Sequence, residues 1–121
     1  MKSFKFKRIY DSWIDVLDLI IGTDSHHNII VEINQGIYLD FDKKGNIYAI
    51  ELVCASQILD MKKEHIPNAN MEILIDISSE SIKFEITRSF VISKKKYSFH
   101  VEWIVSNDYG ISQEIYELSG N

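Results

Sequence analysis

At 121 residues, with 45% hydrophobic and 26% charged side chains, the chain can build one domain around a single core and has the composition of a folded protein. Its 18 acidic and 13 basic side chains give a formal net charge of -5, which argues against nucleic-acid binding and suits a basic partner better. The lone Cys54 excludes an intramolecular disulfide, and no stretch is apolar over the length of a membrane span. We therefore expect one domain over residues 1–121, in the cytoplasm, with no membrane or nucleic-acid partner.

Short runs rich in Ile, Val, Phe, Tyr and Trp, separated by clusters of Gly, Asn, Asp, Ser or Lys, are typical of many short strands. About nine strands are expected by this rule. They cover residues 4–10, 13–21, 28–34, 37–42, 46–53, 71–77, 81–91, 97–106 and 111–118, and "GTDSHHN" between the second and third is expected to form a turn.

One helix is expected near residues 54–65. The stretch "CASQILDMKKEH" loses the two-residue alternation and places four side chains at helical spacing, namely Ala55, Ile58, Leu59 and Lys62. Pro67 cannot easily continue a helix and the neighbouring asparagines favour a turn, so we expect the helix to end before "IPNAN".

The links "SSE", "SKKK" and "NDYG" are so short that they must join antiparallel neighbours, because parallel strands need a long crossover. The fold class is therefore mainly β, or α+β with one helix: an antiparallel meander that forms a sandwich or an open half-barrel. The late strands alternate cleanly, with one face formed by Ile82, Phe84 and Ile86 and another by Tyr97, Phe99, Val101 and Trp103. Such a sheet has one face for the core and one wet face on which a partner can dock.

The stretch "DFDKKGNIYAIE" nearly spells a calcium-binding EF-hand loop, with acids at its first and third places, glycine at its sixth and glutamate at its twelfth. Its fifth place is Lys44, a cation where an oxygen ligand is required, and its flanks are β-branched and aromatic. A hairpin is the better interpretation, with "DKKGN" as the turn and Gly45 left-handed. One face of each strand would then be apolar, formed by Ile37, Leu39 and Phe41 and by Tyr48, Ile50 and Leu52.

No Ser-His-Asp or Cys-His arrangement can be recognised, so the protein is not expected to be an enzyme or to hold a cofactor or metal. His26 and His27 are adjacent and point to opposite sides of an extended chain, and neither has a metal-ligand spacing to His65 or His100. Cys54 is expected to be packed rather than nucleophilic.

Asp40 and Asp42 lie on one side of their strand, where Glu32 or Glu51 can join them in an acidic cluster. Paired carboxylates can act as general acid and base or hold a metal. The lysines that follow Asp42 favour exposed salt bridges instead.

The stretches "YDSWIDVLDLI" and "VEINQGIYLDFDKKGNIYAIELVCAS" resemble the domain-of-unknown-function family numbered 2283. The matching positions are Tyr10, Asp11, Asp15, Val16, Leu17, Glu32, Gly36, Asp40, Asp42, Gly45, Ile50, Glu51, Ala55 and Ser56. The resemblance implies antiparallel strands followed by a helix in a hairpin region over residues 8–60, with no catalytic residues to transfer. The chain departs from the family at Cys54, where an aspartate is usual, and in its β-rich extension over residues 68–119. Some members look like antitoxin partners encoded beside small toxins.

We expect a cytoplasmic protein-binding inhibitor, an antitoxin or immunity protein that neutralises a basic toxin such as a nuclease. Compact size, acidic charge and the lack of a catalytic constellation favour it. The residues expected to contact the partner are Asp40, Asp42, Glu51, Glu102, Trp103 and Tyr109, although Trp103 can equally belong to the core. Two alternatives stay open: a small β-barrel-like protein with a lined cavity for a ligand or metal, and a structural oligomerisation module.

Overall fold

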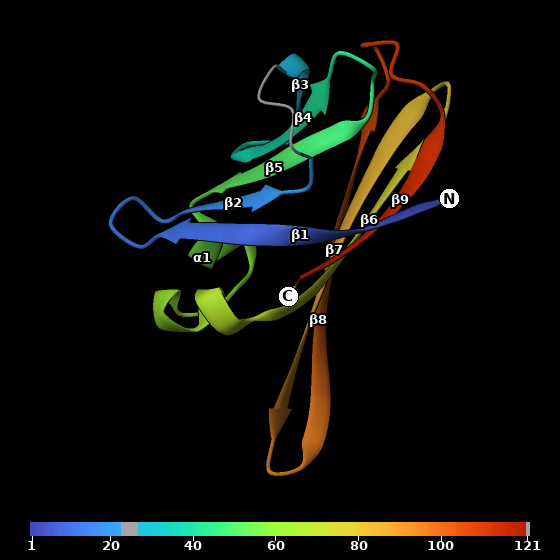
Figure 1. Ribbon diagram of the computed structural model, residues 1–121. Coiled ribbons are helices and arrows are strands. Elements are labelled where there is room, and N and C mark those ends of the chain that lie inside the picture. Colours follow the sequence, from blue (N-terminus) through green and yellow to red (C-terminus); the bar gives the residue numbers. More distant parts are fainter. Residues whose placement is uncertain (23–26, 121) are drawn as a thin grey trace.

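The computed structural model describes residues 1–22 and 27–120, so the expected turn at "GTDSHHN" lies mostly outside it. The described part of the chain forms a 9-stranded sheet in the order β3-β4-β5-β2-β1-β9-β6-β7-β8 (Figure 1). The strands are β1 (Lys2–Asp11), β2 (Val16–Ile20), β3 (His27–Asn34), β4 (Ile37–Asp42), β5 (Ile47–Val53), β6 (Asn70–Ile77), β7 (Ser81–Ile92), β8 (Lys95–Ser106) and β9 (Glu114–Gly120); the helices are α1 (Ala55–Ile58) and the 3-10 helix η1 (Lys63–Asn68). The mainly β class and the number of strands are confirmed.

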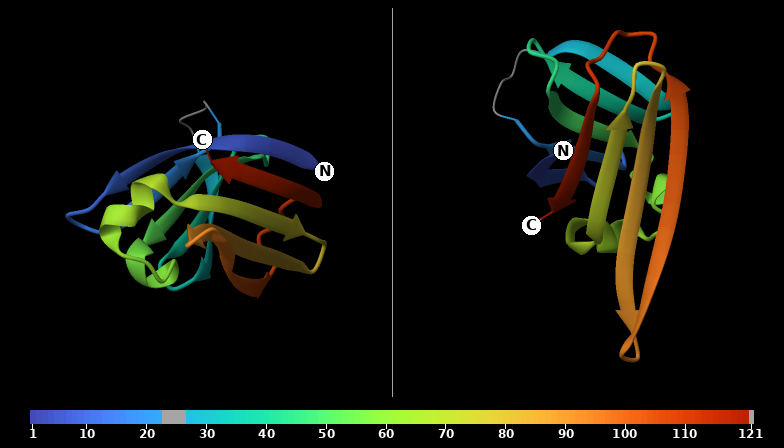
Figure 2. Two further views of the ribbon diagram at one scale, coloured as in Figure 1. Left: turned by 90° about the horizontal axis from the view of Figure 1, so that it is seen from below. Right: turned by 90° about the vertical axis from the view of Figure 1, so that its right-hand side faces the viewer.

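Strand β1 joins the two halves of the sheet, because it changes partner half-way along. Residues 7–11 pair antiparallel with β2, whereas residues 2–6 pair parallel with β9. Pairs joined by tight links, such as β4–β5 and β7–β8, are antiparallel as expected. The parallel pair departs from a simple meander, because β9 pairs with β1 and β6 and not with β8. The expectation that "NDYG" joins antiparallel neighbours was therefore wrong. The result is an open half-barrel that curls around its buried side (Figure 2).

The inner sides of both halves meet in one buried hydrophobic cluster. On β7 the expected alternation is confirmed, since Ile82, Phe84 and Ile86 are fully buried. On β8 the inward-facing residues are half-buried, and the Trp103 ring stacks on Phe84 with 6.0 Å between centroids. Burying such aliphatic and aromatic side chains contributes roughly 1.5–3 kcal/mol each, so these inner faces hold the half-barrel together.

The β4–β5 turn has the predicted shape, with Gly45 at a φ of +81°. The Asp42 carboxylate holds this turn, because its Oδ1 accepts the backbone N–H of Lys44 at 2.9 Å and that of Asn46 at 3.0 Å. The flanks are strands rather than the helices that an EF-hand needs. The hairpin interpretation of this stretch is therefore confirmed.

The two strands of this hairpin differ from the prediction in one side chain. A register shift after Asp40 places Ile47 opposite Phe41, whereas Ala49 stays opposite Asp40. The bulge leaves Ile47 buried and turns Tyr48 to the outer side. The expectation that Tyr48 shares the buried face was wrong for this reason.

The helix expected at residues 54–65 is two shorter helices. The first ends early because Asp60 is left-handed, with a φ of 49°, and the Met61 N–H binds back to the Ser56 carbonyl at 3.0 Å. The second helix includes Pro67, which the sequence analysis placed beyond the helix; its fixed φ fits a 3-10 turn. No helix among the described residues is long and apolar enough to cross a membrane.

The carboxylate of Asp15 binds the start of α1 to the β1–β2 turn. Asp15 is only 9% exposed. Its Oδ1 accepts the backbone N–H of Ser56 at 3.0 Å and the hydroxyl of Tyr10 at 2.7 Å, and its Oδ2 accepts the Ser56 hydroxyl at 2.5 Å. Burial and the bond to Asp15 raise the pKa of Tyr10 to about 12. Asp15 thus satisfies N–H groups that a helix start leaves without partners.

Two arginines donate hydrogen bonds to backbone carbonyls in the segment that connects β5 to β6. Arg8 on β1 donates from Nη1 to the carbonyls of Ile66 at 3.1 Å and Ala69 at 2.7 Å. Arg88 on β7 donates from Nε to the carbonyl of Leu59 at 2.5 Å. The last carbonyls of a helix lack intrahelical partners and favour a cation. The connection from β5 to β6 is therefore tied to both halves of the sheet.

The β7–β8 hairpin closes through a two-residue turn without glycine. Ser93 and Lys94 have φ values of 50° and 66°, and they lie between the paired residues Ile92 and Lys95. Two positive φ values define a type I′ turn, which suits the twist of a hairpin and favours Asn-Gly. A lysine in this position carries backbone strain of about 1–2 kcal/mol.

Replacing Asp15 by asparagine should lower the free energy of unfolding by about 2 kcal/mol at neutral pH. Asparagine tolerates the φ of 54° at this position, so the change removes the charge and one acceptor rather than the backbone geometry. The measurement is urea unfolding followed by fluorescence. The matched control is Asp108→Asn, at an exposed position, which should stay within about 0.5 kcal/mol of the wild type.

The same comparison has a pH dependence. Burial raises the pKa of Asp15, but hydrogen bonds from Ser56 and Tyr10 outweigh burial and hold it below its ordinary value. Because the folded pKa lies below the unfolded one of about 3.9, the carboxylate stabilises the fold above that pH, and its contribution disappears as the pH falls through the folded pKa. The difference between wild type and Asp15→Asn should shrink in acid; a difference that grows there would contradict this role.

Replacing Lys94 by glycine should raise the free energy of unfolding by about 1 kcal/mol, because glycine adopts the positive φ without strain. The control is Lys96→Gly within strand β8, which should lower it by roughly 0.5–1 kcal/mol, as glycine does in a strand. Urea midpoints of the two variants must therefore move in opposite directions.

Candidate functional site

Three acidic side chains lie together on the outer side of β2, β4 and β5. Asp18 lies opposite Glu51, which in turn lies opposite Tyr38, and Asp40 lies in the next cross-strand row opposite Ala49. Their sequence neighbours on β2 and β4 are buried, so the pleat points the acids away from the core. We call the surface formed by Asp18, Asp40 and Glu51 the acidic face.

The acidic face surrounds a pocket of about 440 Å³. The pocket is lined by Asp18, Ile20, Ile30, Tyr38, Asp40, Tyr48, Ala49 and Glu51. Tyr48 lies here as a result of the bulge in β5. An apolar floor with carboxylates at its rim matches a lysine or arginine side chain, which has an aliphatic stem and a cationic end.

Glu51 and Asp18 form a strained pair of like charges. Burial raises the pKa of Glu51, and the charge of Asp18 and a hydrogen bond to its carboxyl raise it further. Like charges directly opposite each other in a sheet are destabilising. A basic ligand placed between the two carboxylates would relieve this repulsion.

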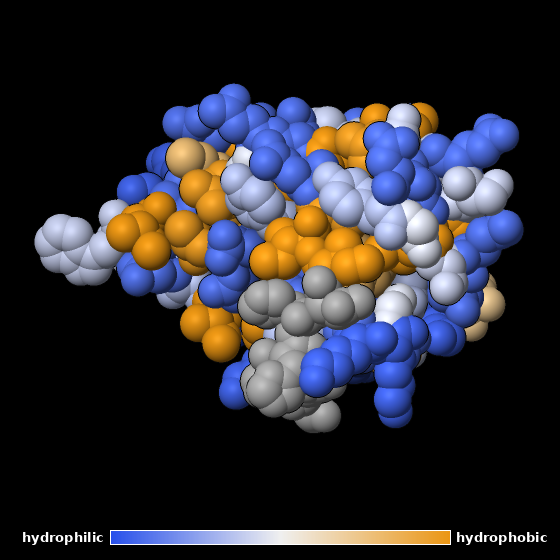
Figure 3. All heavy atoms as spheres, turned by 90° about the horizontal axis from the view of Figure 1, so that it is seen from above, coloured by the Kyte–Doolittle hydropathy of each residue, from blue (hydrophilic) through white to orange (hydrophobic). Residues whose placement is uncertain are grey.

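Exposed apolar side chains lie at the end of the β1–β2 hairpin, on β1 and on the edge strand β3. We call Ile9, Trp13, Ile14 and Ile30 the apolar band. Trp13 is 93% exposed and Ile14 is 65% exposed, and Ile9 lies in the cross-strand row of Asp18. Seen from above, apolar side chains gather between hydrophilic ones on this side of the molecule (Figure 3). Surface patches of this kind mark interaction sites.

The apolar band was missed in the sequence because Trp13 was assigned to a strand over residues 13–21. That strand starts only at Val16. The Asp11 carboxylate accepts the Trp13 N–H at 3.0 Å, which forms a turn instead. An aspartate two residues before the tryptophan was the available signal.

The predicted contact residues are only partly brought together. Asp40 and Glu51 line the same pocket. Asp42 holds the β4–β5 turn, Glu102 and Trp103 face opposite sides of β8, and Tyr109 is exposed in the link before β9. Trp103 packs against the core, as the alternative interpretation of this residue had it.

A second group of ionisable side chains lies on the outer side of β7 and β8. The ligand atoms of Glu85, His100 and Glu102 lie within 4.8 Å of one another, as in a candidate metal site. The Nζ of Lys83 already lies 2.9 Å from Glu85 and 3.5 Å from Glu102. These bonds raise the pKa of Lys83, and the bond from Lys83 lowers that of Glu85. The geometry is thus that of an ion-pair network with its own cation.

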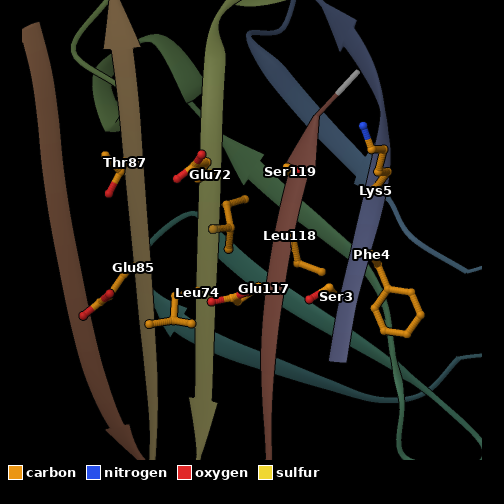
Figure 4. A pocket seen from close by; sticks show the side chains of 11 residues that line it. Ser3, Phe4, Lys5, Glu72, Leu74, Glu85, Thr87, Glu117, Leu118 and Ser119 are labelled. Atoms are coloured by element: carbon orange, nitrogen blue, oxygen red, sulfur yellow. The ribbon is translucent and has the colours of Figure 1, made fainter. Parts of the chain in front are cut away.

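A second pocket of about 590 Å³ lies on the outer side of β1, β9, β6 and β7 (Figure 4). Its rim carries Lys5, Glu72, Glu85 and Glu117. Both of these pockets lie on outer surfaces of the sheet, whereas the inner sides meet in the packed core. Both are therefore open depressions of the outer surface.

The remaining candidates of the sequence analysis lie apart. Cys54, expected to be packed, is exposed, because it is left-handed, with a φ of 61°, just ahead of α1. His26 lies outside the described residues. His65 lies in η1 with its Nε2 3.8 Å from Glu64, and His100 lies on β8.

Residues 7–56 match the model of the family described as a protein of unknown function, DUF2283. This confirms the resemblance for the first half of the chain. The matched range holds the acidic face and the bonded residues Tyr10, Asp15 and Ser56. Neither a curated protein nor a solved structure matches the chain.

Replacing Asp18 by asparagine should lower the pKa of Glu51 towards its ordinary value, because the neighbouring negative charge is removed. A carboxyl NMR titration of both proteins measures this directly. The control is Asp76→Asn on β6, in the other half of the sheet, which should leave the Glu51 titration unchanged. An unchanged midpoint in Asp18→Asn would show that burial alone sets the pKa.

Proposed function

We propose that this protein binds a basic protein partner through the acidic face and neutralises it, as a cytoplasmic antitoxin or immunity protein. One observation carries the proposal: the 93% exposed Trp13 and its apolar neighbours lie on the same half of the sheet as three clustered carboxylates. Exposed tryptophan and aliphatic groups gain free energy when a partner covers them. The carboxylates select a partner of positive charge.

The charge of the whole chain supports the same partner. The net charge of -5 steers a basic protein towards it and repels polyanions. A nuclease must present cations to its polyanionic substrate, so a toxin of that kind carries the complementary surface. An inhibitor that covers those cations with carboxylates excludes the substrate. The resemblance to a family with antitoxin-like members favours this form of binding.

The test is co-expression with the product of the adjacent gene, followed by co-purification and measurement of the dissociation constant. Trp13→Ala should weaken the complex by about 2 kcal/mol, which is roughly thirtyfold. Asp18→Lys with Glu51→Lys should abolish binding and with it the protection of cells from that product.

The matched control reverses two exposed acids on the other half of the sheet, Glu72→Lys with Glu117→Lys, and should bind as the wild type does. Urea midpoints establish that each variant is folded. If the wild type neither binds the adjacent product nor protects cells from it, the proposal is wrong. If both charge reversals weaken binding equally, the acidic face is not the site.

A further inference from the structure

The end of the β7–β8 hairpin projects beyond the rest of the molecule (Figures 1 and 2). We call residues 87–99 the arm. The arm carries four lysine and arginine side chains and no acid, although the whole chain holds 13 basic and 18 acidic residues. Positive charge is thus concentrated in one projecting element of an otherwise strongly acidic protein.

The arm is stiffened by contacts between its own aromatic rings and cations. The rings of Phe90 and Tyr97 stack with 5.5 Å between centroids. The Arg88 guanidinium lies 5.0 Å from the centroids of both Phe90 and Phe99, and the Lys95 Nζ lies 5.6 Å from that of Tyr97. Such contacts order the ribbon before any partner binds. They also cover ring faces on which a nucleic-acid base would have to stack.

The tip of the arm combines exposed aliphatic and basic side chains. Val91 is 67% exposed and Ile92 is 56% exposed, and the exposed lysines 94 to 96 follow directly. The turn at Ser93 and Lys94, where both residues have positive φ values, connects the two strands at this tip. Val91 with Lys96 and Ile92 with Lys95 project from opposite faces of the ribbon, so each face of the tip offers one aliphatic side chain beside a lysine.

The acidic face offers the complement. Its pocket of about 440 Å³ has an apolar floor formed by Ile20, Ile30 and Ala49 and three carboxylates around it. We propose that the arm of one copy docks into the acidic face of a second copy. The exposed aliphatic side chain on one face of the tip enters the pocket, and the lysines of the tip meet Asp18, Asp40 and Glu51.

A second copy fits better than a polyanion, because it presents a matching surface for every arm, whereas the acidic body repels nucleic acid and anionic lipid. The strands of the acidic face and the arm lie at opposite ends of the molecule (Figure 1). The contact is therefore heterologous, head to tail, and gives rings or open-ended chains, whose population grows with concentration. The inference uses the face of the proposed function, so a basic partner and the arm compete for it.

Sedimentation velocity of the full chain tests this contact. At about 50 mM salt the sedimentation coefficient should rise with protein concentration, and the rise should disappear at about 500 mM salt, where charges are screened beyond roughly 4 Å. Two charge-reversed variants should each associate at least about tenfold more weakly. The arm variant carries the three changes Lys94→Glu, Lys95→Glu and Lys96→Glu, and the face variant carries the two changes Asp18→Lys and Glu51→Lys. An equimolar mixture of the two should associate again, because each restores the opposite charge for the other.

The control Glu72→Lys with Glu117→Lys should associate as the wild type does. A wild type that stays monomeric at low salt overturns the inference, and so does an arm variant that still associates normally. Binding of the monomeric wild type to a single-stranded oligonucleotide or to anionic vesicles would assign the arm to a polyanion instead. The arm variant should still bind the adjacent gene product, so failure of this contact and failure of the proposed function are distinguishable.

Discussion

The buried carboxylate of Asp15 holds the start of the connection between the two halves of the sheet. The chain leaves one half at Val53 and enters the other at Asn70, and between them it forms only two short helices. Helices of this length have no stability of their own in water. Asp15 at the start and the guanidinium groups further along replace the missing intrahelical partners, so the connection is held by side chains of the strands it joins. These bonds add to the pairing of β1 with β9 and to the shared core, which join the two halves directly.

Much of this fold could be predicted from the alternation of side chains. The strands at Ile37–Asp42 and Ile47–Val53, and the buried positions of β7, follow from a two-residue period that burial imposes. Other features come from contacts distant in sequence. Tyr48 reached the outer side through a bulge in register with β4, and the helix was divided by the left-handed Asp60, a conformation that the residue type only weakly favours. The parallel partner of β1 is β9, which lies more than a hundred residues away in the sequence.

The candidate site was harder to predict than the fold. Asp40 and Glu51 were recognised as acids near a hairpin, but Asp18 joined them only through the pairing of β2 with β5. Trp13 was assigned to the strand over residues 13–21, whereas it lies in the turn before β2, where the Asp11 carboxylate accepts its N–H. The charge of the chain alone indicates a basic partner, whereas the surface that would receive this partner could be found only from the order of the strands in the sheet.

The pairing of β1 with β9 also has a consequence for the order of folding. Residues 2–6 pair with Glu114–Gly120, so every other strand of the sheet lies between these partners in the sequence. The half formed by β2 to β5 can pair without β9, but the first residues of β1 stay an open edge until β9 is in place. A chain that lacks β9 would therefore keep unpaired backbone groups on β1, which another strand can bind.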